Sequence, residues 1–117
     1  MSTPLDPVEQ GRDRFEEWVA EQVRSRWPGA HVHFRDRAMN GSYHWQIDVP
    51  EVGEFHVAAT EDVLADEYEI ERAEDSLVRE LWLERLPDVP TRAAVVKPGG
   101  RVFGWNPVSD TTIGPLE

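Results

Sequence analysis

The sequence predicts a single α+β domain in which helices cover one face of an antiparallel sheet. Its 117 residues are typical of one domain, and 39% of them are hydrophobic, which is enough for a buried core. Helical spacing of apolar residues marks two segments, alternation of apolar and polar residues marks three strands, and a turn flanked by two apolar runs marks two more. The expected order of elements is therefore α-β-β-β-α-β-β, with an ordered core over residues 7–105 and a loose tail over residues 106–117.

The first helix is expected over residues 7–27. Asp6 is a suitable N-cap, Pro7 suits the first helical position, and Glu9 stands where a capping box places its acid. Apolar side chains then recur at helical spacing, namely Phe15, Trp18, Val19 and Val23. Pro28-Gly29 is expected to end the helix, because proline disfavours helical geometry in the residue before it.

Three strands are expected near residues 31–35, 42–49 and 54–59, joined by turns at residues 38–41 and 50–52. The second turn predicts that Val49 pairs with Gly53, and the first turn predicts that Arg37 pairs with Ser42. The two registers agree, because both place the apolar side chains of the three strands on one face. That face carries Val32, Phe34, Trp45, Ile47, Phe55 and Val57.

A helical pattern follows the three strands. Thr60 is a suitable N-cap, the apolar spacing is helical from Ile70 to Trp82, and Pro87 closes the pattern. Whether residues 60–86 form one helix or two is left open by the pattern. Residues 93–96 and 101–105 then flank Lys97-Pro98-Gly99-Gly100, which indicates a final hairpin. Trp27, beside the end of the first helix, and Trp105, at the end of this hairpin, are candidate anchors for a partner.

The net charge of −11 opposes binding to nucleic-acid phosphates or to anionic lipid. Ten acidic residues lie between Glu61 and Arg85, and the arginines at positions 72, 79 and 85 leave this segment at −7. Such a segment is either a solvated helix face or a surface for a basic partner or a nucleic-acid mimic. Glu67, Glu71 and Glu74 are its candidate binding residues.

The opposite face of the three-stranded sheet is polar, because side chains alternate along each strand. It carries His31, His33, Arg35, His44, Gln46, Asp48, Glu54 and His56. The expected register puts His33, Gln46 and His56 in one row and His31, Asp48 and Glu54 in the next. We interpret this face as a candidate partner-binding surface, with His31, His33, His44, Gln46, Asp48 and His56 as its candidate residues.

Metal binding and catalysis on this face are alternatives with less support. Imidazole and carboxylate groups are ligands for zinc, but side chains diverge from a flat sheet, so no metal and no cofactor are assigned. Ser42, His44 and Asp48 include the residue types of a catalytic triad, but no strained nucleophile turn accompanies them. We assign no catalytic residue and favour a role other than that of an enzyme.

The sequence contains no cysteine, which excludes disulfides and thiolate chemistry. Its first fifteen residues lack the apolar stretch of a signal peptide, and no run of about 18 apolar residues could span a membrane. The expected location is therefore the cytoplasm, without membrane association.

The element order over residues 7–105 resembles that of secretion chaperones. That resemblance implies a protein that forms homodimers and holds segments of client proteins. The α-β-β-β-α part also has the element order of a double-stranded-RNA-binding domain, but the net charge of −11 opposes that activity.

Taken from the sequence, the expected function is that of a non-catalytic, acidic protein-binding module. It would be a chaperone, an immunity or antitoxin-like protein, or an accessory subunit, with a protein partner that is basic if it binds the acidic segment. The alternative is a small ligand-binding or metal-binding protein, or an enzyme, that uses His31, His33, His44, Asp48 and His56.

Overall fold

The computed structural model describes residues 6–37 and 42–116 and contains eleven elements. In chain order they are α1 (Pro7–Arg26), β1 (His31–Arg37), β2 (Ser42–Val49), β3 (Gly53–Thr60), α2 (Glu61–Leu64), α3 (Glu67–Arg79), α4 (Trp82–Arg85), the 3-10 helix η1 (Leu86–Asp88), β4 (Ala93–Lys97), β5 (Arg101–Asn106) and β6 (Thr111–Pro115). The expected turn at residues 38–41 lies outside the described residues.

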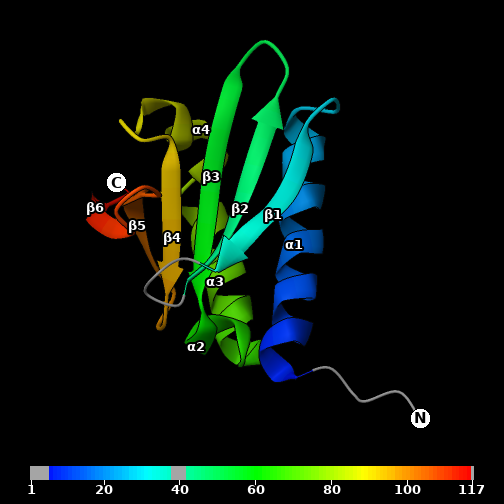
Figure 1. The fold of residues 1–117 in the computed structure, drawn as a ribbon, viewed down its shortest axis with the longest axis vertical. Helices are drawn as coiled ribbons and strands as arrows, with labels where there is room; N and C mark the ends of the chain where they lie inside the picture. The colour runs from blue at the N-terminus through cyan, green and yellow to red at the C-terminus, as the bar shows by residue number, and fades with distance from the viewer. Residues whose placement is uncertain (1–5, 38–41, 117) are drawn as a thin grey trace.

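The strands form one six-stranded sheet in the order β1-β2-β3-β4-β5-β6, and α1 packs on it (Figure 1). The expectation of a purely antiparallel sheet is wrong, because β3 and β4 run parallel while all other neighbours are antiparallel. The helical segment from α2 to η1 carries the chain from the end of β3 back to the start of β4. Such a crossover is the usual connection between parallel neighbours.

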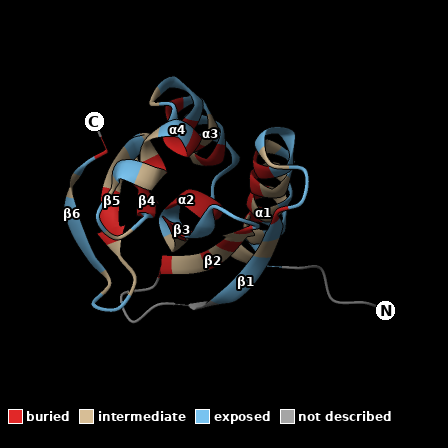
Figure 2. Cartoon of the chain, turned by 90° about the horizontal axis from the view of Figure 1, so that it is seen from above, coloured by how far each residue is buried: buried red, intermediate tan, exposed pale blue. Residues whose placement is uncertain are grey.

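The main core lies between the helices and one face of the sheet, as expected (Figure 2). Phe15, Val19 and Val23 of α1 are fully buried there, together with Trp45 and Ile47 of β2. Leu77 of α3 and Trp82 of α4 join the same cluster. All helices therefore contribute to a single apolar layer on this face.

The expected register of β2 and β3 is confirmed, since Val49 pairs with Gly53 and Trp45 pairs with Val57. The register of β1 is confirmed up to Phe34, which pairs with Trp45. Beyond that point the expected pairing of Arg37 with Ser42 is wrong, because a bulge between Phe34 and Asp36 shifts Arg37 opposite Tyr43. A bulge inserts one extra residue into one strand and so offsets all later pairs.

The open question about residues 60–86 has a structural answer: the segment divides into separate helices. Asp66 begins α3 by accepting a hydrogen bond from the backbone N–H of Tyr68 (2.9 Å). Leu81 adopts a left-handed conformation (φ 54°) between α3 and α4. A non-glycine residue in that conformation interrupts helical geometry, so α4 takes a new direction.

The expectation of a loose tail is wrong for residues 111–115, which form the edge strand β6 against β5. The turn before β6 is held by the Trp105 indole N–H, which donates to Oδ1 of Asp110 (2.7 Å). After β6, the side chain of Leu116 is buried in the main core. The last turn and strand are therefore part of the domain.

The face of the sheet away from the helices carries a second, smaller apolar cluster. Its buried members are Ala58, Ala93, Val95 and Trp105, with Phe103 partly buried beside them. Trp105 has only 1% of its surface exposed, so it is a packing residue and the expectation that it could anchor a partner is wrong. This face therefore divides into an apolar half on β3–β5 and a polar half on β1–β3.

Candidate functional site

The polar half of this face, which we call the histidine face, consists of His31, His33, His44, Gln46, Asp48, Glu54 and His56. The pairing of the strands places these residues as expected: His33, Gln46 and His56 lie opposite one another in one row. His31, Asp48 and Glu54 form the next row. The sheet thus brings together residues that are up to 25 positions apart in the sequence.

The outer part of the histidine face is open to solvent. Nε2 of His33 lies 3.2 Å from Oδ2 of Asp48, and the two side chains are 54% and 42% exposed. Gln46 donates from Nε2 to Oδ1 of the same carboxylate (2.9 Å). The rings of His31 and His33 stack with their centroids 6.2 Å apart. Asp48 therefore orders its neighbours while donors and acceptors stay accessible.

The inner part of the face is a hydrogen-bonded chain of three side chains. Oε2 of Glu54 lies 2.8 Å from Nε2 of His56, and Nδ1 of His56 lies 2.8 Å from Nε2 of His44. An ionised carboxylate only accepts, so Nε2 of His56 carries a proton. In a neutral His56 ring, Nδ1 then accepts from Nε2–H of His44, which leaves Nδ1 of His44 without a proton.

His44 lies where the polar half of the face meets the apolar half. Its ring contacts Trp105 edge to face, with centroids 4.9 Å apart and planes at 79°. Burial is the main cause that lowers the pKa of His44 to about 4, and the nearby His56 and Arg35 lower it further. Asp110 and Glu54 oppose that change only in part. His44 is therefore neutral throughout the physiological pH range.

The metal-binding alternative requires several ligand side chains that converge on one ion. Within residues 6–37 and 42–116, no group of three or more His, Asp or Glu side chains is arranged to hold a metal ion. His33 instead pairs with Asp48 and His44 with His56 across neighbouring strands, and His56 pairs with Glu54 along β3. These pairwise contacts occupy ring nitrogens that a metal ion would need.

The acidic candidates lie elsewhere, because Glu67, Glu71 and Glu74 belong to α3 in the helical layer. Arg14 of α1 lies 3.7 Å from a carboxylate oxygen of Glu71 and 3.7 Å from one of Glu74. Burial raises the pKa of Glu74, and Arg14 opposes that effect. Glu71 and Glu74 thus bridge α3 to α1. Of these three candidates, Glu67 alone is exposed and has no such bridge to a described residue.

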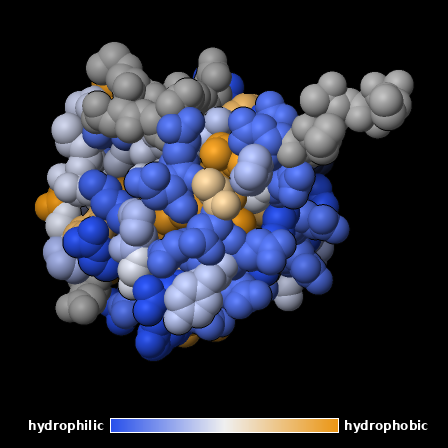
Figure 3. All heavy atoms as spheres, turned by 90° about the horizontal axis from the view of Figure 1, so that it is seen from below, coloured by the Kyte–Doolittle hydropathy of each residue, from blue (hydrophilic) through white to orange (hydrophobic). Residues whose placement is uncertain are grey.

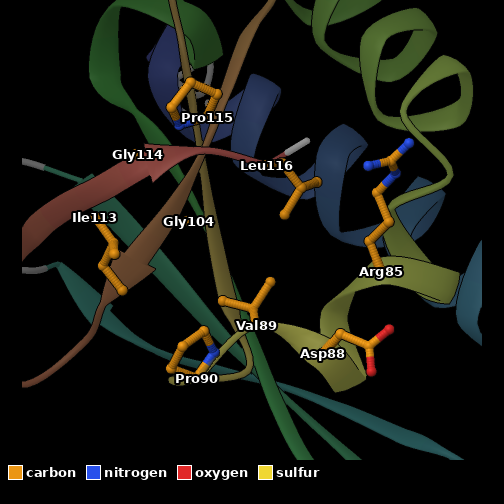
Figure 4. Close-up of a pocket in the computed structure, with 9 residues that line it drawn as sticks. All are labelled: Arg85, Asp88, Val89, Pro90, Gly104, Ile113, Gly114, Pro115 and Leu116. Atoms are coloured by element: carbon orange, nitrogen blue, oxygen red, sulfur yellow. The ribbon is translucent and has the colours of Figure 1, made fainter.

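The clefts on the surface of the described residues include four that no histidine lines. One has a volume of about 320 Å³ and lies between the η1 region and the β5–β6 hairpin, lined by Arg85, Asp88, Val89 and Ile113 among others (Figure 4). A groove of about 670 Å³ runs between α1 and β1. The end of the molecule at which α1 begins is mainly hydrophilic (Figure 3).

Sequence reasoning missed two features of the site. It placed Glu54 on the histidine face but did not foresee the chain from Glu54 through His56 to His44. It also treated Trp105 as independent of the histidines, although the rings of Trp105 and His44 are in contact. The parallel pairing of β3 with β4 brings β5 to this face, and that pairing gives no signal in the sequence.

Comparison with known proteins gives no match: no protein-family model, no curated protein and no solved structure is significantly similar to this chain. Among the described residues, no helix is long and apolar enough to cross a membrane.

Proposed function

We propose that this protein is a non-catalytic protein-binding module that contacts its partner through the histidine face. The observation that carries the proposal is the side-chain arrangement of this face, a polar surface on β1–β3 whose residues are held by hydrogen bonds to one another. Small-molecule sites are concave, whereas protein partners dock on surfaces of roughly 800 Å² per side. No histidine lines any of the four clefts described above, which favours a macromolecular partner for this face.

The hydrogen bonds within the face support this role. Asp48 holds His33 and Gln46, and Glu54 holds His56, so these side chains have little rotational freedom left to lose. Binding is stronger when the contacting side chains are ordered beforehand, because immobilising each one costs about 0.5–1.5 kcal/mol. His31 and His33 are the exposed residues that a partner would contact first.

The test is affinity capture from a lysate of the source organism with three baits. The first is the unaltered protein, the second carries His31→Ala and His33→Ala, and the third carries Glu67→Ala and Glu71→Ala. All four positions are exposed, so the variants should fold, which circular dichroism checks. We expect a stoichiometric partner that the histidine variant loses and the glutamate variant keeps.

Other results lead elsewhere. Loss of the partner only with the glutamate variant would contradict the proposal and move the site to α3. Absence of a partner with every bait would contradict a protein-binding role and favour the alternative, a small ligand-binding protein or an enzyme.

That alternative is favoured by one observation, the chain from Glu54 through His56 to His44. A carboxylate that orients an imidazole is an arrangement used for proton transfer. The metal-binding version has a direct test: zinc, nickel or manganese should raise the melting temperature if a site exists. An unchanged melting temperature with all three ions would rule out the metal-binding version of the alternative.

A further inference from the structure

The strand β1 is an edge of the sheet, since the strand order begins with it and it pairs only with β2 among the described strands. An edge strand presents a row of backbone N–H and C=O groups that can pair with another chain. Residues 31–34 form a regular stretch before the bulge, and α1 lies alongside β1 (Figure 1). This edge is therefore a potential template for an added strand.

The groove of about 670 Å³ between α1 and β1 runs along this edge. Half-buried Val32 lines it on the side of β1. The lining residues of α1 include four acidic side chains, namely Asp13, Glu16, Glu17 and Glu21, and one basic side chain, Arg24. The groove beside the open edge is thus strongly negative, so its electrostatic complement is a cationic chain.

Two of these acids already have partners within the domain. Glu16 accepts a hydrogen bond from the indole N–H of Trp45 (3.0 Å), and Asp13 lies 3.3 Å from Arg12. Glu17 and Glu21 are exposed and have no ion-pair partner among the described residues. They are the carboxylates that remain available to a ligand in the groove.

The spacing of the acids matches that of an extended chain. Asp13, Glu17 and Glu21 follow one another at intervals of four residues, which is about 6 Å along a helix. Every second residue of a β-strand advances about 6.6 Å and points to the same side. A strand added beside β1 would therefore bring alternate side chains next to these acids and the others next to His31 and His33.

We propose that an extended basic segment of a partner protein, with Lys or Arg at every second position, pairs with β1 and lies in the groove beside α1. This inference goes beyond the contact proposed for the histidine face, because it concerns the edge of the sheet and the flank of α1. A second copy of this chain is a poor occupant of the edge. Pairing of β1 with β1 would bring two acidic flanks of α1 together in a protein of net charge −11.

The first experiment uses three synthetic peptides of eight residues with the protein at about 0.15 M salt. One has Lys alternating with Val and Thr, the second has the same composition with its lysines consecutive, and the third repeats the first with N-methylated Val backbones. The N-methyl groups block strand pairing and keep the charge. NMR shifts of the backbone amides of residues 31–34, followed during titration, report binding at the edge.

We expect the alternating peptide to shift these amides and to bind at least tenfold more tightly than either control peptide. Equal affinity for the N-methylated peptide would overturn the proposal, because binding would then not depend on strand pairing. Equal affinity for the consecutive-lysine peptide would overturn it too, because binding would then not depend on lysines at alternate positions. Absence of shifts at residues 31–34 at millimolar peptide would overturn it as well. Dimerisation in sedimentation, with these amides protected from exchange, would assign the edge to a second copy instead.

A matched pair of variants tests the groove. Glu17→Gln with Glu21→Gln should weaken binding of the alternating peptide at least fivefold. Glu67→Gln with Asp75→Asn removes the same charge from α3, and it should change the affinity less than twofold. Equal effects of the two variants would mean that only the net charge matters, which would contradict the groove as the binding site.

Discussion

Replacing His44 by glutamine should change how the stability of the protein depends on pH. Burial and the neighbouring His56 and Arg35 lower the pKa of His44 from 6.5 to about 4 in the folded protein. In the unfolded chain the same imidazole takes up a proton near pH 6.5. Because the folded pKa is the lower one, the stability that neutral His44 supports is present above pH 6.5 and is lost as the pH falls toward 4.

The magnitude follows from the difference between the two pKa values. Between the unfolded pKa of about 6.5 and pH 5, the free energy of unfolding falls by roughly 1.4 kcal/mol per pH unit. At pH 5 the loss is therefore about 2 kcal/mol. Because the side chain is only partly buried, solvent screening reduces this to about 1 kcal/mol. His44→Gln removes the titration, and its amide N–H can replace the imidazole as a donor to His56.

The assay is urea unfolding followed by tryptophan fluorescence at pH 7.5, 6.5, 5.5 and 5.0. The free energy of the unaltered protein minus that of the variant should fall by about 1 kcal/mol from pH 7.5 to pH 5.0. The carboxylates are the same in both proteins, so their contribution to the pH dependence cancels in the difference between the two unfolding free energies. His31→Gln shows what removal of an exposed imidazole does on the same face. A difference that stays constant with pH, or an NMR titration of His44 with its midpoint near 6.5, would refute the reasoning.

Two further substitutions test the packing on the two faces of the sheet. Gly11→Ala should destabilise the domain by about 2–3 kcal/mol, because the new Cβ would lie 1.7 Å from the backbone oxygen of Leu64. This cost outweighs the helix propensity of alanine, which favours the variant by about 1 kcal/mol. As a control, Ser25→Ala at an exposed position of α1 should change the free energy of unfolding by less than about 0.5 kcal/mol in the same urea measurement. Trp105→Phe should cost about 2–3 kcal/mol, because it removes the donor to Asp110 and leaves a smaller ring in a buried site. Hydrogen exchange in β6 should quicken in that variant, and unchanged exchange would contradict the role given to this hydrogen bond.

The parts of the fold that were predictable depend on neighbours in the sequence. Asp6 and Pro7 define the start of α1 through local hydrogen bonding and backbone geometry. The β2–β3 register follows from a short turn and from alternation, since a slip by one residue would expose Trp45 and Ile47. Both kinds of signal act over a few residues, so the sequence contains them in full.

The parts that failed depend on contacts between distant segments. An element order cannot tell which strand β4 joins, and β4 lies beside β3 because the helices between them return the chain to that edge. The segment that forms β6 contains Gly114 and Pro115, which disfavour a strand in most positions. At the edge of a sheet the missing N–H of proline is tolerated, and Leu116 gains burial in the core.

The same distinction explains the candidate site. Strand alternation predicted that the four histidines share a face, but it treated them as equivalent. Their difference arises from β5, which brings Trp105 against His44 and so separates a half-buried, neutral imidazole from the exposed His31 and His33. His31 and His33 are exposed, whereas His44 is half-buried against Trp105, so the outer histidines are the more accessible to a partner. For this reason the binding test alters His31 and His33 alone, whereas the stability test alters His44.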